Sequence, residues 1–263
     1  MKVYKKLLSF GCSFTEGGGL NSPVYHRFLR GEDVSDYNFS YFNTTRSKME
    51  TMLPEHIEYA TYHSYPGYLS RILNCDFLNF GSSGASNEYI FNKAYQEIQK
   101  IANKSEALIT IQASFLNRIT LQLPLVKGEV NINMLEGIRS GLSKYPDIAE
   151  VAYKYYESYL GYFFDTEYSY KILCRDIDIF SEYCKSKNLD VVFLMYDKPV
   201  THSINPHPLV VDLGYRDLDD LWRSEKLAIS HFTNHVIEDG HFSERGNEVV
   251  ANLIFQYVKK IYG

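Results

Sequence analysis

The sequence is poor in cysteine, in tryptophan and in long apolar runs. Its four cysteines show neither a Cys-x-x-Cys spacing nor the clustering of a metal site, so we expect free thiols rather than a disulfide framework. No apolar stretch approaches the roughly 18 residues of a membrane-spanning helix. The first residues run straight into an apolar strand without a small-residue cleavage site, which predicts no signal peptide and a cytoplasmic protein.

Positive charge is also scarce. Lysine and arginine number 27 against 32 aspartates and glutamates, which gives a formal charge of −5. A protein that binds the phosphate backbone of nucleic acids normally carries a basic excess, so we expect no nucleic-acid partner. The run Gly17-Gly18-Gly19 lacks the Gly-Lys-Ser/Thr ending of a phosphate-binding loop, and nucleotide binding is not indicated. His231 and His235 have the spacing of two metal ligands, but no third ligand is evident, so we expect neither a metal nor another cofactor.

Aromatic residues, in contrast, are abundant, with 23 tyrosines and 16 phenylalanines. A tyrosine ring offers a flat apolar face and a polar tip, which suits carbohydrate ligands, although tyrosine also fills cores and half-buried surfaces. The aromatic content is therefore compatible with a glycan ligand without indicating one by itself.

Apolar strands alternate with amphipathic helices along the chain. Strands are predicted at residues 5–10, 76–80, 107–112 and 190–196, and helices at residues 66–73, 87–101, 147–164, 167–187 and 244–262. This alternation predicts a mainly parallel sheet within one domain over residues 1–263. Residues 20–60 and 113–145 have no clear period and are interpreted as insertions.

The first strand ends in a group of small polar residues bracketed by glycine. Ser13 stands at the carboxyl end of that strand, where ligands bind in open α/β sheets. His241 stands just before the last helix, so both side chains are expected at the same edge of the sheet. A histidine can take the proton of a serine hydroxyl, and an acid can fix the histidine tautomer. The pattern therefore points to nucleophilic catalysis by serine.

Three short motifs, in the right order, resemble those of the GDSL/SGNH serine hydrolases. The segment Phe10-Gly11-Cys12-Ser13-Phe14-Thr15 resembles the first block, with Cys12 where the family usually has aspartate. Residues 79–84 (Asn-Phe-Gly-Ser-Ser-Gly) resemble the second block, and residues 238–247 resemble the last. The resemblance implies a three-layer α/β/α sandwich of the SGNH, flavodoxin-like type, with a five-stranded, mostly parallel sheet and insertions.

The resemblance also implies roles for individual residues. Ser13 would be the nucleophile and His241 the general base, while Cys12 is interpreted as a small buried neighbour. The orienting acid stays open between two residues. The usual spacing acid-x-x-His selects Glu238, whereas the Asp-Gly-His order seen here favours Asp239, whose short side chain can fold back on the ring.

The third family block, Gly-x-Asn-Asp, is missing after the third strand, where Ala113-Ser-Phe-Leu-Asn-Arg118 stands instead. An oxyanion hole needs donors aimed at the developing negative charge. The backbone amides of Ser13 and Gly84 are expected to supply two of them, because glycine lets a backbone approach the substrate. Asn117 is the candidate for a side-chain donor, with Gln112, Ser114 and Asn87 as alternatives.

Together these features predict a serine hydrolase that cleaves acyl esters, as an esterase or a carbohydrate O-deacetylase. Its partner would be a small-molecule or glycan ester. An O-acyltransferase that uses the same site is one alternative, because both reactions pass through an acyl-serine. A non-catalytic carbohydrate-binding module is another, since a fold does not guarantee its usual function and the third block is missing.

Overall fold

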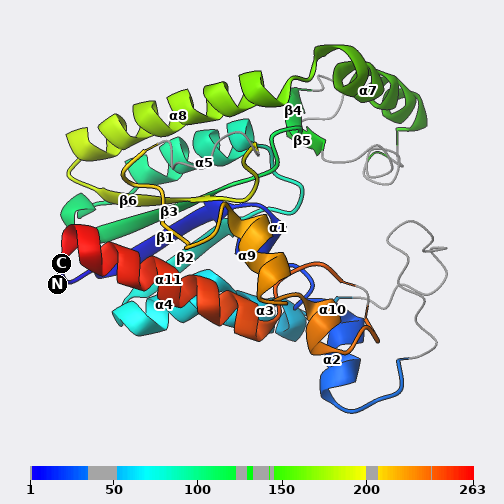
Figure 1. Ribbon diagram of the computed structural model, residues 1–263, viewed down its shortest axis with the longest axis horizontal. Helices are drawn as coiled ribbons and strands as arrows, with labels where there is room; N and C mark the ends of the chain where they lie inside the picture. Colours follow the sequence, from blue (N-terminus) through cyan, green and yellow to red (C-terminus); the bar gives the residue numbers. More distant parts are fainter. Residues whose placement is uncertain are drawn as a thin grey trace.

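The computed structural model describes residues 2–34, 52–122, 129–132, 142, 145–199, 207–237 and 239–263. At its centre lies a parallel sheet in the order β2-β1-β3-β6 (Figure 1). The strands are β1 (Lys6–Gly11), β2 (Asp76–Gly81), β3 (Ala107–Ala113) and β6 (Asp190–Met195). β1 pairs with β2 from Lys6↔Asp76 to Gly11↔Gly81 and with β3 from Lys6↔Ala107 to Phe10↔Ile111. The strand that leads to Ser13 is therefore paired with a neighbouring strand on each side.

Helices cover both faces of the sheet, as Figure 1 shows. α4 (Tyr65–Leu73) and α11 (Glu244–Tyr262) pack together on one face, and α5 (Asn87–Gln99) and α8 (Thr166–Ser186) lie on the other. The predicted three-layer α/β/α arrangement is thus confirmed. In α11 the apolar residues spaced four apart, Val250, Ile254 and Val258, are all fully buried, as expected for a helix that lies on a sheet.

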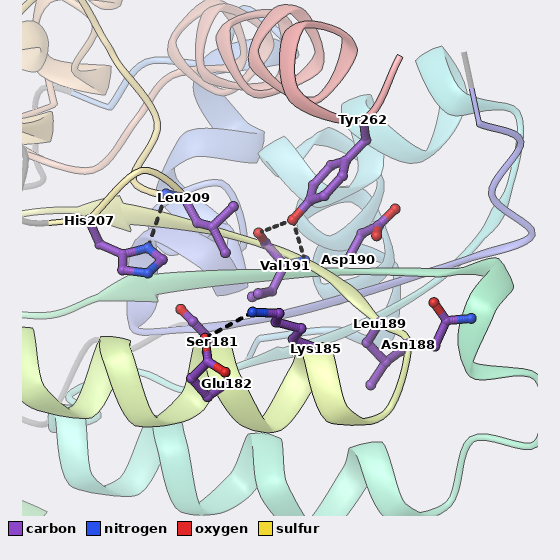
Figure 2. Close-up of a pocket in the computed structure, with 10 residues that line it drawn as sticks. All are labelled: Ser181, Glu182, Lys185, Asn188, Leu189, Asp190, Val191, His207, Leu209 and Tyr262. Atoms are coloured by element: carbon purple, nitrogen blue, oxygen red, sulfur yellow. Dashed lines mark hydrogen bonds and ion pairs between the residues drawn. The ribbon is translucent and has the colours of Figure 1, made fainter.

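The prediction of five strands was wrong for the described residues, where the sheet has four. The position beyond β6 is filled by one isolated bridge between Phe193 and Val210. Further along the same edge, the hydroxyl of Tyr262 accepts from the amide of Val191 at 3.3 Å and donates to its carbonyl at 3.0 Å (Figure 2). A side chain at the end of α11 thus satisfies the backbone groups that a fifth strand would have paired.

The two insertions lie near the carboxyl end of the sheet, on opposite sides of it in Figure 1. The first contains α2 (Pro23–Leu29) and α3 (Pro54–His63), close to the start of α11. The second contains the antiparallel pair β4 (Ile119–Gln122) and β5 (Glu129–Ile132), close to the start of α8. Residues 35–51, 123–128, 133–141 and 143–144 of these insertions lie outside the described part of the chain.

The remaining elements are mostly short. They are α1 (Ser13–Glu16), η2 (Lys104–Glu106), α7 (Pro146–Ser158), the π-helical turn η3 (Tyr159–Phe163), α9 (Leu218–Ser224) and α10 (Ile229–Phe232). All four cysteines are free thiols, as predicted. Among the described residues, no helix combines the length and the apolarity that crossing a bilayer would require.

Candidate active site

Ser13 is the first residue of α1, which begins immediately after β1. A side chain at Gly11 would collide with Oγ1 of Thr15 and with Cβ of Gln112, so the strand can enter the helix this sharply because glycine stands there. The turn brings Ser13 to the carboxyl end of the sheet, where the residue is 5% exposed.

Buried hydrogen bonds fix α1 in place. The hydroxyl of Thr15 donates to Oε1 of Gln112 at 2.5 Å and lies 3.1 Å from the hydroxyl of Tyr65. The side chain of Asn79 donates to the carbonyl of Thr15 at 2.7 Å, and its oxygen accepts from the amide of Gly81 at 2.9 Å. Asn79 in the second sequence block therefore joins the end of β2 to the helix that carries Ser13.

Asp239 and His241 form a hydrogen-bonded pair. Oδ1 of Asp239 lies 2.7 Å from Nδ1 of His241 and accepts from the backbone amide of the same residue at 2.8 Å. This is the tight reversal that the Asp-Gly-His order suggests. Glu238, the alternative acid, lies outside the described residues.

The loop that carries this pair is anchored to α10. The amide of Ile229 donates to the carbonyl of His241 at 2.9 Å, and the amide of Ser230 donates to the carbonyl of Asp239 at 3.0 Å. Directly after the loop, the hydroxyl of Ser243 caps α11 by accepting from the amide of Gly246 at 3.2 Å. The imidazole is therefore held by a backbone that is fixed at both ends.

The electrostatics of the pair keep Asp239 ionised. Burial by itself raises the pKa of this carboxyl, but the charge of His241 and the hydrogen bonds from its ring and its amide outweigh burial, so the pKa lies below the ordinary value. An ionised, buried carboxylate at Nδ1 holds a proton on that nitrogen and leaves Nε2 free to accept one.

Gly18 lies next to both Ser13 and His241. The position that a Cβ would take on Gly18 is 3.0 Å from Cβ of Ser13 and 3.0 Å from Nε2 of His241, so these two atoms lie no more than twice that distance apart. The two side chains are therefore neighbours. Without substrate, catalytic hydrogen bonds are often long and tighten on binding.

Gly17-Gly18-Gly19, the glycine run after the first block, leads the chain past the candidate site residues. Gly17 and Gly19 adopt positive φ angles of 88° and 81°. A Cβ on Gly19 would lie 2.9 Å from Oδ2 of Asp239 and 3.1 Å from Cβ of His241. The chain can pass this close to Ser13, Asp239 and His241 because positions 18 and 19 are glycine.

The ring of Phe14 contacts the imidazole and packs against two other aromatic rings. The ring of Phe14 lies 5.1 Å from that of His241, 5.0 Å from that of Phe242 and 4.6 Å from that of Tyr196, measured between centroids. Trp222 covers the backbone between the paired acid and histidine, with Cζ2 3.5 Å from the Cβ position of Gly240. These contacts hold the ring in an apolar setting that strengthens its polar interactions.

Gly84 ends the turn that follows β2. It is buried and has a φ of 78°, a value that favours glycine. The turn is closed by a 3.0 Å hydrogen bond from the amide of Ala85 to the carbonyl of Ser82, and the amide of Ser82 donates to the carbonyl of Gly11, two residues before Ser13, at 3.0 Å. The second block and the first are thus joined through their backbones.

The candidates for a side-chain oxyanion donor differ in how much of their hydrogen-bonding capacity is committed. Gln112 is fully buried and bonded to Thr15 and to Cys12. The side chain of Asn87 bonds the amide and the carbonyl of Ser114, at 2.7 and 3.3 Å. Asn117 is half-buried, and among the described residues its side-chain amide has no hydrogen bond, which leaves that amide available to a ligand.

Glu16, a residue that the sequence motifs did not single out, lies close enough to His241 to interact with it electrostatically. Its carboxylate accepts from the amide of Ser83. Burial raises the pKa of Glu16, and the Ser83 amide and the charge of His241 offset this only in part. Two carboxyl groups, those of Asp239 and Glu16, therefore interact electrostatically with His241.

Figure 2 shows a cavity of about 360 Å³ that lies away from Ser13 and His241. It follows the outer edge of β6 near its amino end, between α8 and the end of α11, and is lined by residues such as Lys185, His207 and Tyr262. Neither Ser13 nor His241 contributes to it. His231 and His235 have ring centroids 5.2 Å apart, and no group of three metal-ligating side chains occurs within the described part of the chain.

Comparisons with known proteins give distant structural similarities. No family model matches the chain, and no curated protein matches it in sequence. A lipolytic protein of the G-D-S-L family from Veillonella parvula is similar over 98% of each chain, with 13% identity and a TM-score of 0.40. A G-D-S-L lipolytic protein from Desulfitobacterium hafniense is similar over 96% of this chain and 99% of its own, with 10% identity and a TM-score of 0.35.

A carbohydrate esterase whose active site is described as having divergent catalytic and non-catalytic binding functions is also similar. The match covers 100% of this chain and 67% of that one, with 13% identity and a TM-score of 0.41.

Proposed function

We propose that this protein is a serine hydrolase that cleaves acyl esters, with Ser13 as nucleophile, His241 as general base and Asp239 as the acid that orients the base. The observation that carries the proposal is the 2.7 Å contact between Asp239 and Nδ1 of His241, on an imidazole whose Nε2 lies 3.0 Å from the same Cβ position of Gly18 that is 3.0 Å from Cβ of Ser13. This is the order acid, histidine, serine that acyl transfer requires.

In the proposed reaction, Oγ of Ser13 attacks the ester carbonyl while Nε2 of His241 accepts the hydroxyl proton. The carbonyl oxygen becomes negative, and the bond to the leaving alcohol breaks as His241 returns the proton to the alcohol oxygen. Water then attacks the acyl-serine with help from the same base, and the acid product leaves. Asp239 stays ionised throughout, which fits a carboxyl whose pKa lies below the ordinary value.

We also propose that the negative oxygen is bound by the backbone amides of Ser13 and Gly84 and by the side chain of Asn117. Support for Gly84 comes from its buried turn, which is bonded to the residue two positions before Ser13. Support for Asn117 comes from its available amide at the carboxyl end of β3. Removing one such donor typically costs about a hundredfold or more in kcat.

The substrate is proposed to be a small-molecule or glycan ester. The aromatic side chains of Phe14, Phe115 and Tyr196 form one connected group beside Ser13, with successive ring centroids 4.4 to 4.6 Å apart. Phe14 and Tyr196 are buried, so of this group only the half-buried Phe115 can meet a substrate, and a flat apolar face suits acyl chains and sugar rings alike.

The test combines labelling with turnover. A fluorophosphonate should modify Ser13, as identified by mass spectrometry of the peptides, and p-nitrophenyl esters of increasing chain length should be hydrolysed. Ser13→Ala should abolish labelling and lower the rate by several orders of magnitude, whereas Ser158→Ala, at an exposed position on α7, should leave both unchanged. A Ser13→Ala enzyme that hydrolyses esters at the wild-type rate would refute the proposal.

A further inference from the structure

Arg118 is a half-buried cation at the carboxyl end of β3, in the loop that leads to β4. Its Nη1 donates to the hydroxyl of Ser114 at 2.7 Å, and its guanidinium carbon lies 4.4 Å from the centre of the Phe115 ring. No carboxylate among the described residues forms an ion pair with it. This is unexpected in a chain in which acidic residues outnumber basic ones, 32 to 27.

Arg71 and Arg245 also have no acidic partner among the described residues, but both are exposed. The five other described arginines are paired with acids. Their partners are Glu32 for Arg27 and Arg30, Asp176 for Arg175, Asp217 for Arg216 and Asp219 for Arg223. Several of those arginines are more exposed than Arg118, and their charges need a partner less. A partly buried charge without a counterion is unfavourable, so its position calls for a ligand that supplies the opposite charge.

The surroundings of Arg118 connect it with the proposed active site. The Phe115 ring on which it stacks lies 4.4 Å from the ring of Tyr196, which lies 4.6 Å from that of Phe14, the neighbour of Ser13. The Ser114 that binds its guanidinium is bonded through its backbone to Asn87, three residues after Gly84. Arg118 therefore stands at the far end of the aromatic group that lies beside the nucleophile.

The guanidinium is also held in a fixed orientation. Stacking on Phe115 sets its plane, and the bond to Ser114 occupies one of its five N–H groups. A planar fork with free donors matches the oxygens of a carboxylate or a phosphate. The contacts that connect it with Phe14 pass through two aromatic rings, which suits a substituent remote from the reacting carbonyl.

We propose that Arg118 binds an anionic group, a carboxylate or a phosphate, that the ester substrate carries at a distance from the scissile bond. This inference rests on the proposed function, because it assigns a substrate class to the same site. It makes Arg118 a specificity-determining residue that acts on the substrate rather than on the reacting atoms.

The test uses pairs of esters that differ in one charge. Mono-p-nitrophenyl esters of succinate, glutarate and adipate end in a carboxylate, and their monoamides are neutral and of nearly the same shape. The wild-type protein should prefer the carboxylate of at least one pair. Arg118→Gln should lower the ratio of kcat/KM between the two members about tenfold, and Arg118→Lys should lower it less, since lysine keeps the charge but not the fork. Arg175→Gln, at an exposed arginine of α8, is the control and should leave the ratio unchanged.

The ratio is measured within one protein, so a general loss of activity or folding does not affect it. An unchanged ratio in Arg118→Gln, including an equal loss on both esters, would overturn the proposal. Competitive inhibition of neutral-ester hydrolysis by glutarate and by inorganic phosphate identifies the preferred anion, and inhibition by either one should weaken in Arg118→Gln. Inhibition by neither would count against the proposal.

A protein that hydrolyses none of these esters would refute the proposed function alone. The anion site would then be tested by titrating Ser13→Ala with the same ester pairs in a calorimeter. Tighter binding of the carboxylate member, lost in a Ser13→Ala/Arg118→Gln variant, would support the site, and equal binding of both members would refute it.

Discussion

Gly18 lies against the imidazole of His241, so that a Cβ at this position would be 2.9 Å from Cδ2 and 3.0 Å from Nε2 of the ring. The same Cβ would be 3.0 Å from Cβ of Ser13. The space between the two proposed catalytic side chains is therefore bounded by a residue without a side chain. Any methyl group added there would have to push one of them aside.

Gly18→Ala should consequently inactivate the enzyme without unfolding it. Gly18 does not have a positive φ, so alanine can adopt its backbone conformation. A misplacement of about 1 Å in a catalytic group can cost about a hundredfold in rate, and we expect a loss of kcat/KM of at least that order. The measurement is p-nitrophenyl ester hydrolysis beside thermal unfolding of the same sample.

The matched control for this substitution is Gly161→Ala. Gly161 is exposed, lies in η3 and has no atom within 4 Å of its Cβ position, so the methyl group should affect neither activity nor folding adversely. Full activity in Gly18→Ala would contradict the proposal that Ser13 and His241 act together on either side of Gly18.

The acid of the site gives a second prediction. Asp239→Asn should lower kcat strongly, because an amide in place of the carboxylate would no longer hold His241 in the productive tautomer or stabilise its charged form. Glu238→Gln should have a mild effect and serves as the neighbouring control. The ratio of the two kcat losses is the measurement. A larger loss in Glu238→Gln would transfer the role to Glu238 and restore the acid-x-x-His spacing.

Much of the fold follows from local pattern. The strand predicted at residues 190–196 is β6 (Asp190–Met195), and the helix predicted at residues 244–262 is α11 with the same bounds. The helix shows a clear period because one of its faces is buried, and the strand is a continuous apolar run because both of its faces are buried. That the described sheet has four strands and not five could not be anticipated in the same way. The free edge of β6 is paired with Val210 by one bridge and with the hydroxyl of Tyr262, a residue distant in the sequence.

The sequence motifs predicted which residues form the candidate site, but not the contacts between them. The order of the motifs is enough to expect Ser13, Asp239 and His241 at one edge, and the structure brings the last two into contact. The contacts of Gly18 and the position of Glu16 relative to His241 are not visible in sequence, because they join residues more than 200 positions apart. The short helices of the insertions likewise depend on tertiary packing more than on propensity.

A third prediction concerns how the first insertion is attached to the end of the chain. The carboxylate of Glu244, at the start of α11, accepts hydrogen bonds from the hydroxyls of Tyr25 in α2 and Tyr59 in α3. Tyr25 is fully buried. Removing the acceptor leaves a buried hydroxyl without a partner, so Glu244→Ala should lower the free energy of unfolding by about 1–3 kcal/mol.

Urea denaturation measures this difference, provided that the m-value stays constant. Glu248→Ala, one turn further along α11 at an exposed position, is the control and should change stability by a few tenths of a kcal/mol. Equal effects of the two substitutions would show that Glu244 acts through the helix alone and not through the tyrosines.

The last prediction concerns pH and the histidines of the same attachment. His26 of α2 stacks on His56 of α3 with ring centroids 4.1 Å apart, and His63 lies 3.3 Å from a carboxylate oxygen of Glu244. Burial, with a smaller contribution from His56, lowers the pKa of His26, although the carbonyl of Leu20 opposes the shift. Burial also lowers the pKa of His63, and Glu244 offsets this only in part.

Because both pKa values lie below the ordinary histidine value, the unfolded chain binds more protons than the folded one as soon as the pH falls below about 6.5. Stability should therefore be complete above that pH and decrease towards pH 5. Melting curves should show the decrease as a lower Tm, by about 2–4 °C for each kcal/mol lost. In His26→Gln/His63→Gln, glutamine keeps hydrogen-bonding groups but cannot be protonated, so the difference in Tm between pH 7.5 and pH 5.5 should shrink. His207→Gln, beside the distant cavity of Figure 2, should retain the wild-type difference. An equal pH dependence in all three proteins would mean that protonation of His26 and His63 does not loosen the attachment of α2 and α3.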